Sequence, residues 1–232
     1  MLVTAAVGRA IRLAGTRAGT PAQCSNRCDC NANCRQVPQR RVGTSGRKPA
    51  STARSHRLQL TNQRIDWLAR SLRRRPGSGV LVRRVQYQVR GWNRAELDAL
   101  EDAEIALASM REHFDAAKMV VVGHSMGGRV AAHLSASGDV GAVVALAPWW
   151  PRDDADLIPN TCRLLVMHGT ADTWTDPHSS YRQTLRARDR GVDAQWMPIE
   201  GAGRDFLRQW PRWHRLTAQF AASQLSERLL EP

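Results

Sequence analysis

Short apolar runs alternate with amphipathic stretches from about residue 60 to the end of the chain. The apolar runs are rich in β-branched residues, which is typical of buried strands. The stretches between them repeat apolar residues every three or four positions, which indicates helices. Strands are predicted at residues 80–89, 119–122, 142–147, 163–167 and 194–197. Helices are predicted at residues 61–75, 94–114 (capped by Asn93), 128–134, 177–190 and 206–230, the last broken near Pro211.

Strands that alternate with helices in this way predict an α/β fold. The expected architecture is a mostly parallel sheet with helices on both faces. Ligands of such sheets bind outside the carboxyl ends of the strands. A chain of 232 residues is long enough for one sizeable core, which we place in residues 58–232.

Residues 1–57 have a different character, with many Arg, Ser, Pro and Gln residues and neither strand nor helix periodicity. Residues 1–65 hold 12 basic residues and one acidic residue, a net charge of +11, whereas residues 66–232 hold 22 basic and 20 acidic residues, a net charge of +2. The total of +13 therefore belongs almost entirely to the N-terminal part. We predict that residues 1–57 form a basic segment of low order.

The clustered cysteines suggest a metal site, but their spacing argues against one. Four of the five cysteines, Cys24, Cys28, Cys30 and Cys34, are closely spaced, but without the paired C-x2-C units of common zinc sites. We interpret this cluster as incidental. Cys162 precedes a predicted strand and is expected to be a small buried residue. Nothing in the sequence requires a metal or an organic cofactor.

The most informative motif is G-x-S-x-G at residues 123–127, between the predicted strand 119–122 and the predicted helix 128–134. A strand, a sharp turn and a helix are the setting in which this motif forms a nucleophile elbow. We expect Gly123 and Gly127 to be glycines because a side chain at either position would collide with the returning chain. The bend would lift the hydroxyl of Ser125 clear of the backbone. The start of the helix would direct N–H groups at an oxyanion beside it.

These residues resemble the α/β-hydrolase family over about residues 65–220. The resemblance implies a small serine esterase in which Ser125 is the nucleophile and the Met126 N–H is one oxyanion donor. Residues 168–172 are similar to the family's H-G-x-x-D turn, which implies that Asp172 is the catalytic acid. We expect Asp176 to cap the following helix and His168 to pack or hydrogen-bond within the turn.

The position of the family's catalytic histidine holds Arg204, in the stretch EGAGRDFL at residues 200–207. Arginine stays protonated near neutral pH and cannot act as a base. It could instead form an ion pair with Asp172. His214, His178 and His124 are weak candidates for a replacement base, because each lies on an element that should hold it away from Ser125.

A second departure concerns the loop that gives the family its other oxyanion donor, often with an H-G motif. No H-G pair occurs before Ile65, and residues 1–57 stand where the family's first strands should be. The sheet is therefore expected to lack these strands. In the loop of residues 148–161, Trp149 and Trp150 either line an acyl pocket or pack beneath the loop, and the sequence leaves both interpretations open.

Three functions follow from these observations. The first is hydrolysis of a small-molecule carboxylic ester through an acyl-serine at Ser125, impaired by the loss of the histidine. The second is a catalytically inactive relative that acts as a scaffold or binding protein. The third, nucleic-acid binding by the basic segment, is weakly supported, because aromatic residues do not alternate with its charges. No apolar run is long enough for a membrane span. A cytoplasmic protein is expected. The sequence does not specify the oligomeric state.

Overall fold

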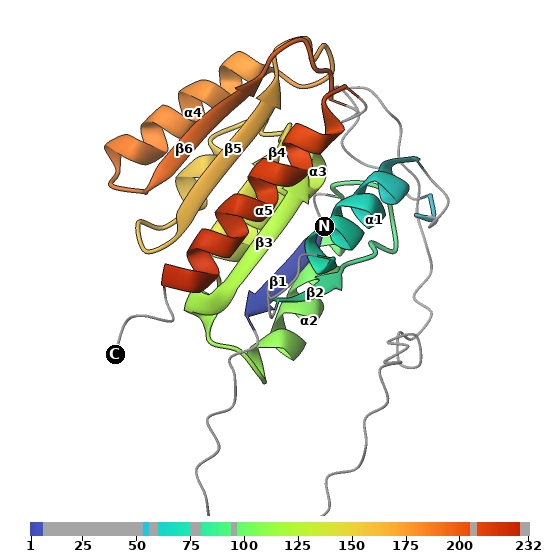
Figure 1. Cartoon of the computed structure of the whole chain (residues 1–232), viewed down its shortest axis with the longest axis vertical. Coiled ribbons are helices and arrows are strands. Elements are labelled where there is room, and N and C mark those ends of the chain that lie inside the picture. Colours follow the sequence, from blue (N-terminus) through green and yellow to red (C-terminus); the bar gives the residue numbers. More distant parts are fainter. Residues whose placement is uncertain (7–52, 56–59, 75–79, 94–96, 205–207, 228–232) are drawn as a thin grey trace, which may run out of the picture.

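The computed structural model describes residues 1–6, 53–55, 60–74, 80–93, 97–204 and 208–227, which form a six-stranded sheet flanked by helices (Figure 1). The sheet has the strand order β2-β1-β3-β4-β5-β6. Its strands are β1 (Leu2–Ala6), β2 (Val80–Arg84), β3 (Met119–His124), β4 (Ala142–Leu146), β5 (Arg163–Gly169) and β6 (Ala194–Ile199). The α-helices are α1 (Leu60–Arg73), α2 (Asp98–Arg111), α3 (Met126–Ser135), α4 (Pro177–Asp189) and α5 (Trp210–Glu227). This architecture confirms the predicted α/β fold class.

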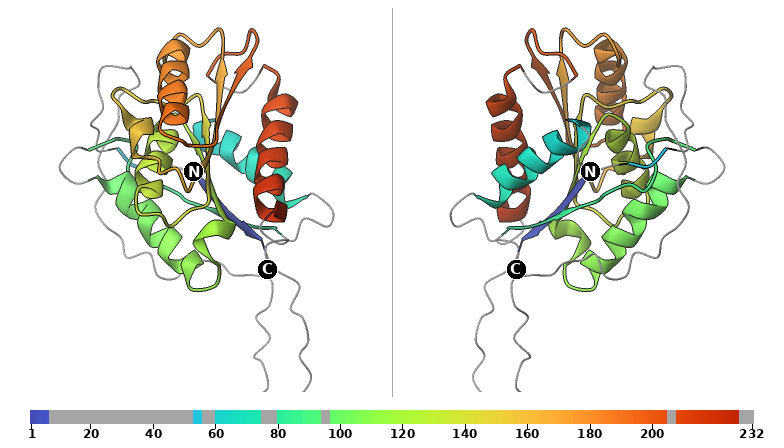
Figure 2. Two further views of the ribbon diagram at one scale, coloured as in Figure 1. Left: turned by 90° about the vertical axis from the view of Figure 1, so that its left-hand side faces the viewer. Right: turned by 90° about the vertical axis from the view of Figure 1, so that its right-hand side faces the viewer.

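The parallel part of the sheet is formed by β3 to β6, and β3 is buried on both of its faces. Val121 packs into one apolar cluster, whereas Val120 and Val122 pack into the other. Successive side chains of a strand point to opposite faces, so a run of apolar residues suits a strand covered on both sides. Helices α2, α3 and α4 contribute to the first cluster, and α1 and α5 contribute to the second. Figure 2 shows these two helical layers on opposite sides of the sheet.

Strand β1 is a feature that the sequence analysis did not predict, since it assigned no strand to residues 1–57. It lies between β2 and β3 and pairs antiparallel with both, with Leu2 opposite Arg84 on one side and Val122 on the other. Leu2 and Val3 are fully buried. An exposed edge of β3 would leave backbone N–H and C=O groups unpaired, and β1 supplies their partners. The boundary between residues 57 and 58 stays a prediction, and Cys24 to Cys34 lie outside the described residues.

Several elements start or end at other residues than expected. Helix α2 begins at Asp98 after Leu97, which has a left-handed backbone (φ 45°), so Asn93 is not its cap. The Asn93 amide instead donates a hydrogen bond to the Asp98 side chain (2.5 Å). Pro211 lies in the first turn of α5 rather than breaking it, a position where proline removes no helical hydrogen bond. Strand β2 ends at Arg84, earlier than the predicted residue 89.

Other local predictions are confirmed. The Asp176 side chain caps α4 by accepting a hydrogen bond from the His178 N–H (2.9 Å). Cys162 is fully buried, and burial raises the pKa of its thiol to about 12. Within the described part of the chain, no helix combines the length and apolar character needed to cross a membrane.

The loop between β4 and β5 is fastened to α3 by a buried carboxylate. Asp154, 4% exposed, accepts a hydrogen bond from Arg129 Nε (2.6 Å) and lies 3.4 Å from His133 Nε2. Burial alone would raise the pKa of Asp154, but the contacts with His133 and Arg129 outweigh it and lower the pKa. Trp150 is buried and donates to the Gly128 carbonyl (3.2 Å), and Trp149 lies beside the Arg129 guanidinium. These contacts favour the packing interpretation of both tryptophans.

The two adjacent aspartates of this loop provide a matched test. We expect Asp154→Ala to lower the free energy of unfolding by about 3 kcal/mol, because it leaves the partly buried Arg129 without its counter-ion. Asp153→Ala removes a largely exposed ion pair with Arg186 and should cost at most about 0.5 kcal/mol. Urea denaturation of both variants measures the difference. Equal losses would contradict the role assigned to Asp154.

Candidate active site

Ser125 lies at the bend between the end of β3 and the start of α3. Its backbone has φ 55° and ψ −115°, a conformation that side chains rarely adopt. Its N–H donates to the Leu146 carbonyl (2.9 Å), which continues the β3–β4 pairing into the bend. A Cβ added at Gly123 would lie 2.0 Å from the Gly127 carbonyl oxygen. The bend therefore requires glycine at position 123, as expected.

The expected collision does not occur at Gly127. A Cβ there would have ordinary contacts, 3.4 Å from the Tyr87 hydroxyl and 3.8 Å from Met1. The crowded position is the next one, because a Cβ at Gly128 would lie 2.9 Å from Cβ of Pro148. The returning chain thus excludes a side chain at the first glycine, and the loop after β4 crowds the position that follows the motif.

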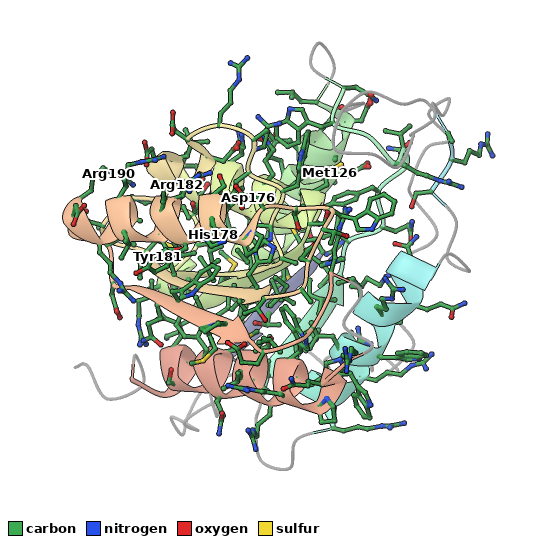
Figure 3. The ribbon with its side chains drawn as sticks, turned by 90° about the horizontal axis from the view of Figure 1, so that it is seen from above. Met126, Asp176, His178, Tyr181, Arg182 and Arg190 are labelled. Carbon is green, nitrogen blue, oxygen red and sulfur yellow. The ribbon has the colours of Figure 1, made fainter. Side chains whose placement is uncertain are left out.

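The first turn of α3 begins directly after Ser125. The Ser125 carbonyl accepts hydrogen bonds from the N–H groups of Gly128 and Trp149 (both 3.0 Å). The Met126 N–H lies in this first turn, where N–H groups have no acceptor inside the helix. Figure 3 shows Met126 at the start of α3, seen from above. The bend thus places a hydroxyl beside the positive end of a helix.

Asp172 follows β5 and is held by its own turn. Its Oδ1 accepts from the N–H groups of Trp174 (2.7 Å) and Thr175 (3.0 Å). Its Oδ2 accepts from Thr175 Oγ1 (2.6 Å) and lies 3.2 Å from His168 Nε2. Burial would raise the pKa of Asp172, but these hydrogen bonds hold the pKa well below its usual range. The carboxylate is therefore ionised, with both oxygens engaged within the turn.

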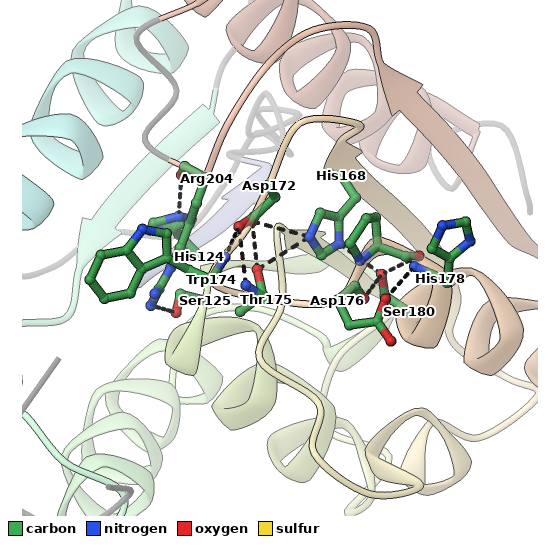
Figure 4. Close-up of polar contacts among 11 residues, drawn as sticks. His124, Ser125, His168, Asp172, Trp174, Thr175, Asp176, His178, Ser180 and Arg204 are labelled. Carbon is green, nitrogen blue, oxygen red and sulfur yellow. Dashed lines mark hydrogen bonds and ion pairs between the residues drawn. The ribbon is translucent and has the colours of Figure 1, made fainter. Parts of the chain in front are cut away.

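His168 belongs to this turn and not to the Ser125 bend. It is fully buried, and its Nδ1 lies 2.7 Å from Oγ of Ser180, which is also buried. Ser180, His168 and Asp172 thus form a Ser–His–Asp array inside the protein (Figure 4). Ser180 lies on α4, where its hydroxyl contacts the Pro177 carbonyl (3.1 Å). The array connects β5 to α4, and it confirms the prediction that His168 hydrogen-bonds within the turn.

Arg204, which follows β6, reaches Ser125. Its guanidinium donates a hydrogen bond to Ser125 Oγ, and its carbonyl oxygen lies 2.9 Å from His124 Nε2 (Figure 4). The guanidinium also lies 5.9 Å from the ring of Trp174, which is half exposed. Burial lowers the pKa of Arg204, and the negative charge of Asp172 opposes this shift. Arg204 therefore bonds to the hydroxyl, and the suggested ion pair with Asp172 is not the contact that forms.

The three other histidines considered from the sequence have separate surroundings. Burial and the nearby Arg204 charge lower the pKa of His124 to about 3, so this residue is a very weak base. His178 is exposed in the first turn of α4, next to Asp176 (Figure 3). His214 is buried on α5 against the Trp210 ring, and burial lowers its pKa.

Comparison with known proteins identifies the fold. The model of the alpha/beta hydrolase family matches residues 53–231, which is most of the chain. The chain belongs to the alpha/beta hydrolase family. A comparison with curated proteins found no match.

Two solved structures named as alpha/beta hydrolases share this fold at low sequence identity. A putative alpha/beta hydrolase from Agrobacterium tumefaciens is 18% identical, with a TM-score of 0.58 over 75% of this chain and 82% of that one. An alpha-beta serine hydrolase homologue from Coxiella burnetii is also 18% identical, with a TM-score of 0.55 over 69% and 76% of the two chains. A predicted CIB-like hydrolase from Thermoplasma acidophilum is 21% identical, with a lower TM-score of 0.47. That match spans 57% of this chain and 63% of the other.

Two residues near the bend were not identified from the sequence. Tyr87, just after β2, places its hydroxyl beside Gly127, and Trp174 lies beside the Arg204 guanidinium. The segment after β2 leaves the sheet at the same edge as Ser125, because both β2 and β3 run antiparallel to β1. Because the predicted sheet lacked β1, the sequence analysis had no reason to place Tyr87 there. Trp174 was detectable as an aromatic residue two positions after Asp172.

The motif's two glycines should tolerate substitution very differently. We expect Gly123→Ala to lower the free energy of unfolding by at least about 2 kcal/mol, because its Cβ overlaps backbone that cannot move aside. Gly127→Ala should stay within about 1 kcal/mol of wild type, since alanine favours the helix and meets only ordinary contacts. Thermal and urea unfolding measure both. Comparable losses at the two positions would contradict the geometry of the bend.

Asp172 should make stability depend on acid pH. Its folded-state pKa is lower than its unfolded value of about 3.9, so its stabilising contribution is present above that value and is lost as the pH falls. The stability difference between wild type and Asp172→Asn should therefore be largest near neutral pH and shrink below about pH 4. Urea denaturation at several pH values measures it. Asp193→Asn, at a largely exposed ion pair with Arg163, is the control and should show no comparable change.

Proposed function

We propose that the protein hydrolyses carboxylic esters of small molecules through an acyl-enzyme on Ser125, with slow turnover. The observation that carries this proposal is the strained bend at Ser125, which joins a fully buried strand to the start of a helix. Membership of the alpha/beta hydrolase family supports a hydrolytic reaction. The choice of an ester rests on the resemblance of the motif to small serine esterases.

In the proposed reaction, Ser125 Oγ bonds to the acyl carbon while the bond to the alcohol oxygen breaks. The serine proton leaves the hydroxyl, the alcohol departs in protonated form, and water then releases the acid and restores the serine. The Met126 N–H is the proposed donor to the oxyanion that forms on the carbonyl oxygen. Asp172 is the proposed acid, and its negative charge offsets part of the positive charge of Arg204.

The slow step is the removal of the serine proton. Arg204 donates to Ser125 Oγ and has no lone pair with which to take a proton. The Asp172 oxygens are engaged by Thr175, Trp174 and His168, so the acid is coupled to its own turn. Water must then accept the proton, which forgoes a general-base contribution of about 10²–10⁴-fold.

One observation favours a second candidate function, that of a non-catalytic relative that acts as a scaffold or binding protein. The hydrogen bond from Arg204 engages one of the two lone pairs of Ser125 Oγ and so makes the hydroxyl a poorer nucleophile. If this contact persists when a ligand is present, the hydroxyl is held as a structural group. The chain would then keep the bend as architecture only.

Substitution of Arg204 distinguishes the two candidates. We expect Arg204→His to raise kcat/KM for a short-chain nitrophenyl ester by about 10²-fold or more, because a neutral imidazole at this position accepts the serine proton. Arg204→Gln is the matched control, since it removes the charge without adding a base. It should give a far smaller gain.

The wild-type protein is measured beside Ser125→Ala in the same assay. Slow turnover that disappears in Ser125→Ala supports the esterase proposal. Equal gains in Arg204→His and Arg204→Gln would mean that release of a blocked hydroxyl, not a restored base, explains the rate. Absence of serine-dependent turnover in both the wild type and Arg204→His would favour the non-catalytic relative.

A further inference from the structure

The Tyr87 hydroxyl is a buried polar group that the proposed reaction has not yet used. Its oxygen is inaccessible to solvent and has no hydrogen-bond partner among the described residues. The ring packs against the apolar cluster formed with α2, α3 and α4. A phenylalanine would pack in the same way without burying an unsatisfied hydroxyl, which destabilises a fold. The hydroxyl therefore requires an explanation beyond packing.

The position of Tyr87 follows from the antiparallel strand β1. Strands β2 and β3 both pair antiparallel with β1 and so run in the same direction (Figure 1). The chain leaves β2 at the edge of the sheet where Ser125 lies, and Tyr87 follows three residues after Arg84. Its hydroxyl oxygen is 3.4 Å from the position of a Cβ on Gly127. It thus borders the first turn of α3, which also contains the Met126 N–H.

The nearby polar groups do not satisfy this hydroxyl. The Asp102 charge is close enough to affect the pKa of the Tyr87 hydroxyl. The Asp102 carboxylate, however, accepts hydrogen bonds from the Gln88 N–H (2.7 Å) and the Gln88 side chain (2.8 Å). Burial, with a smaller contribution from Asp102, raises the pKa of Tyr87 well above its usual range. The phenol consequently keeps its proton at every working pH and remains a hydrogen-bond donor.

We propose that Tyr87 is the second oxyanion donor of the Ser125 site, and that its hydroxyl pairs with the substrate oxygen that the Met126 N–H also binds. This inference rests on the proposed hydrolysis at Ser125. In this proposal the phenol replaces the backbone N–H of the family's early loop, for which no H-G pair occurs before Ile65. The ligand would supply the partner that the hydroxyl lacks within the protein, and because the oxygen is closed to solvent, the groups that cover it have to move aside when the ligand binds.

The test measures the reactivity of Ser125 toward an alkyl fluorophosphonate. In this reaction Ser125 Oγ bonds to phosphorus while the P–F bond breaks, and the serine proton and fluoride leave. The phosphoryl oxygen takes the place of the oxyanion. We expect Tyr87→Phe to slow labelling of Ser125 by about 10²-fold, measured by intact-protein mass spectrometry in both the wild-type and Arg204→His backgrounds. The melting temperature should stay unchanged or rise, because the variant removes an unsatisfied buried hydroxyl.

The other tyrosine of the chain provides the matched control. Tyr181 is exposed on α4 with its ring against Trp196, so Tyr181→Phe should leave the labelling rate unchanged. Equal rates for the wild type and Tyr87→Phe, with labelling lost in Ser125→Ala, would overturn the role of Tyr87 and leave the proposed function intact. Absence of serine-dependent labelling in both backgrounds would overturn both. A large fall in melting temperature on Tyr87→Phe would show that the hydroxyl supports the fold and would also overturn the inference.

Discussion

The site depends on one steric constraint, the close approach of the chain to itself at Gly123. The space beside its Cα is filled by the Gly127 carbonyl, so only glycine permits the strand to end and the helix to begin within so short a distance. The bend imposes a positive φ on Ser125, and burial of β3 on both faces prevents it from relaxing. Loss of this contact would separate the Ser125 hydroxyl from the start of α3. The other residues of the candidate site would then no longer lie around one hydroxyl.

Asp172 and the Ser125 hydroxyl have different hydrogen-bond partners, although the charge of Asp172 acts on Arg204. Asp172 uses its oxygens to organise the turn between β5 and α4, where His168 and Thr175 hold it in the ionised state. Arg204 uses its guanidinium on Ser125 Oγ. A histidine at position 204 would have joined these two groups by accepting from one and donating to the other. Arginine has hydrogen-bond donors only. Its presence at position 204, where the family has histidine, therefore removes the proton path but leaves the surrounding framework in place.

Much of this arrangement was predictable from the sequence, because it is encoded locally. The buried strand, the bend at Ser125 and the cap at Asp176 follow from residues within a few positions of one another. Strand β1 was not predictable, because its pairing joins residues 2–6 to strands more than 70 positions away. The left-handed backbone of Leu97 and the open space beside Gly127 were not predicted for a similar reason. Tertiary packing determines the backbone before α2 and the neighbours of α3.

Two unfavourable features occur together at this edge of the sheet, and their proximity bears on whether the site is used. Ser125 is held in a strained conformation, and the Tyr87 hydroxyl beside the same helix turn is buried without a partner. Each costs stability on the order of 1–3 kcal/mol, and neither is needed to pack the surrounding core. Local violations of folding rules tend to gather where a ligand supplies the missing interaction. A ligand whose oxygen lies between the Met126 N–H and the Tyr87 hydroxyl would give the hydroxyl its missing partner beside the strained Ser125, so the proximity of the two features supports the proposed binding site.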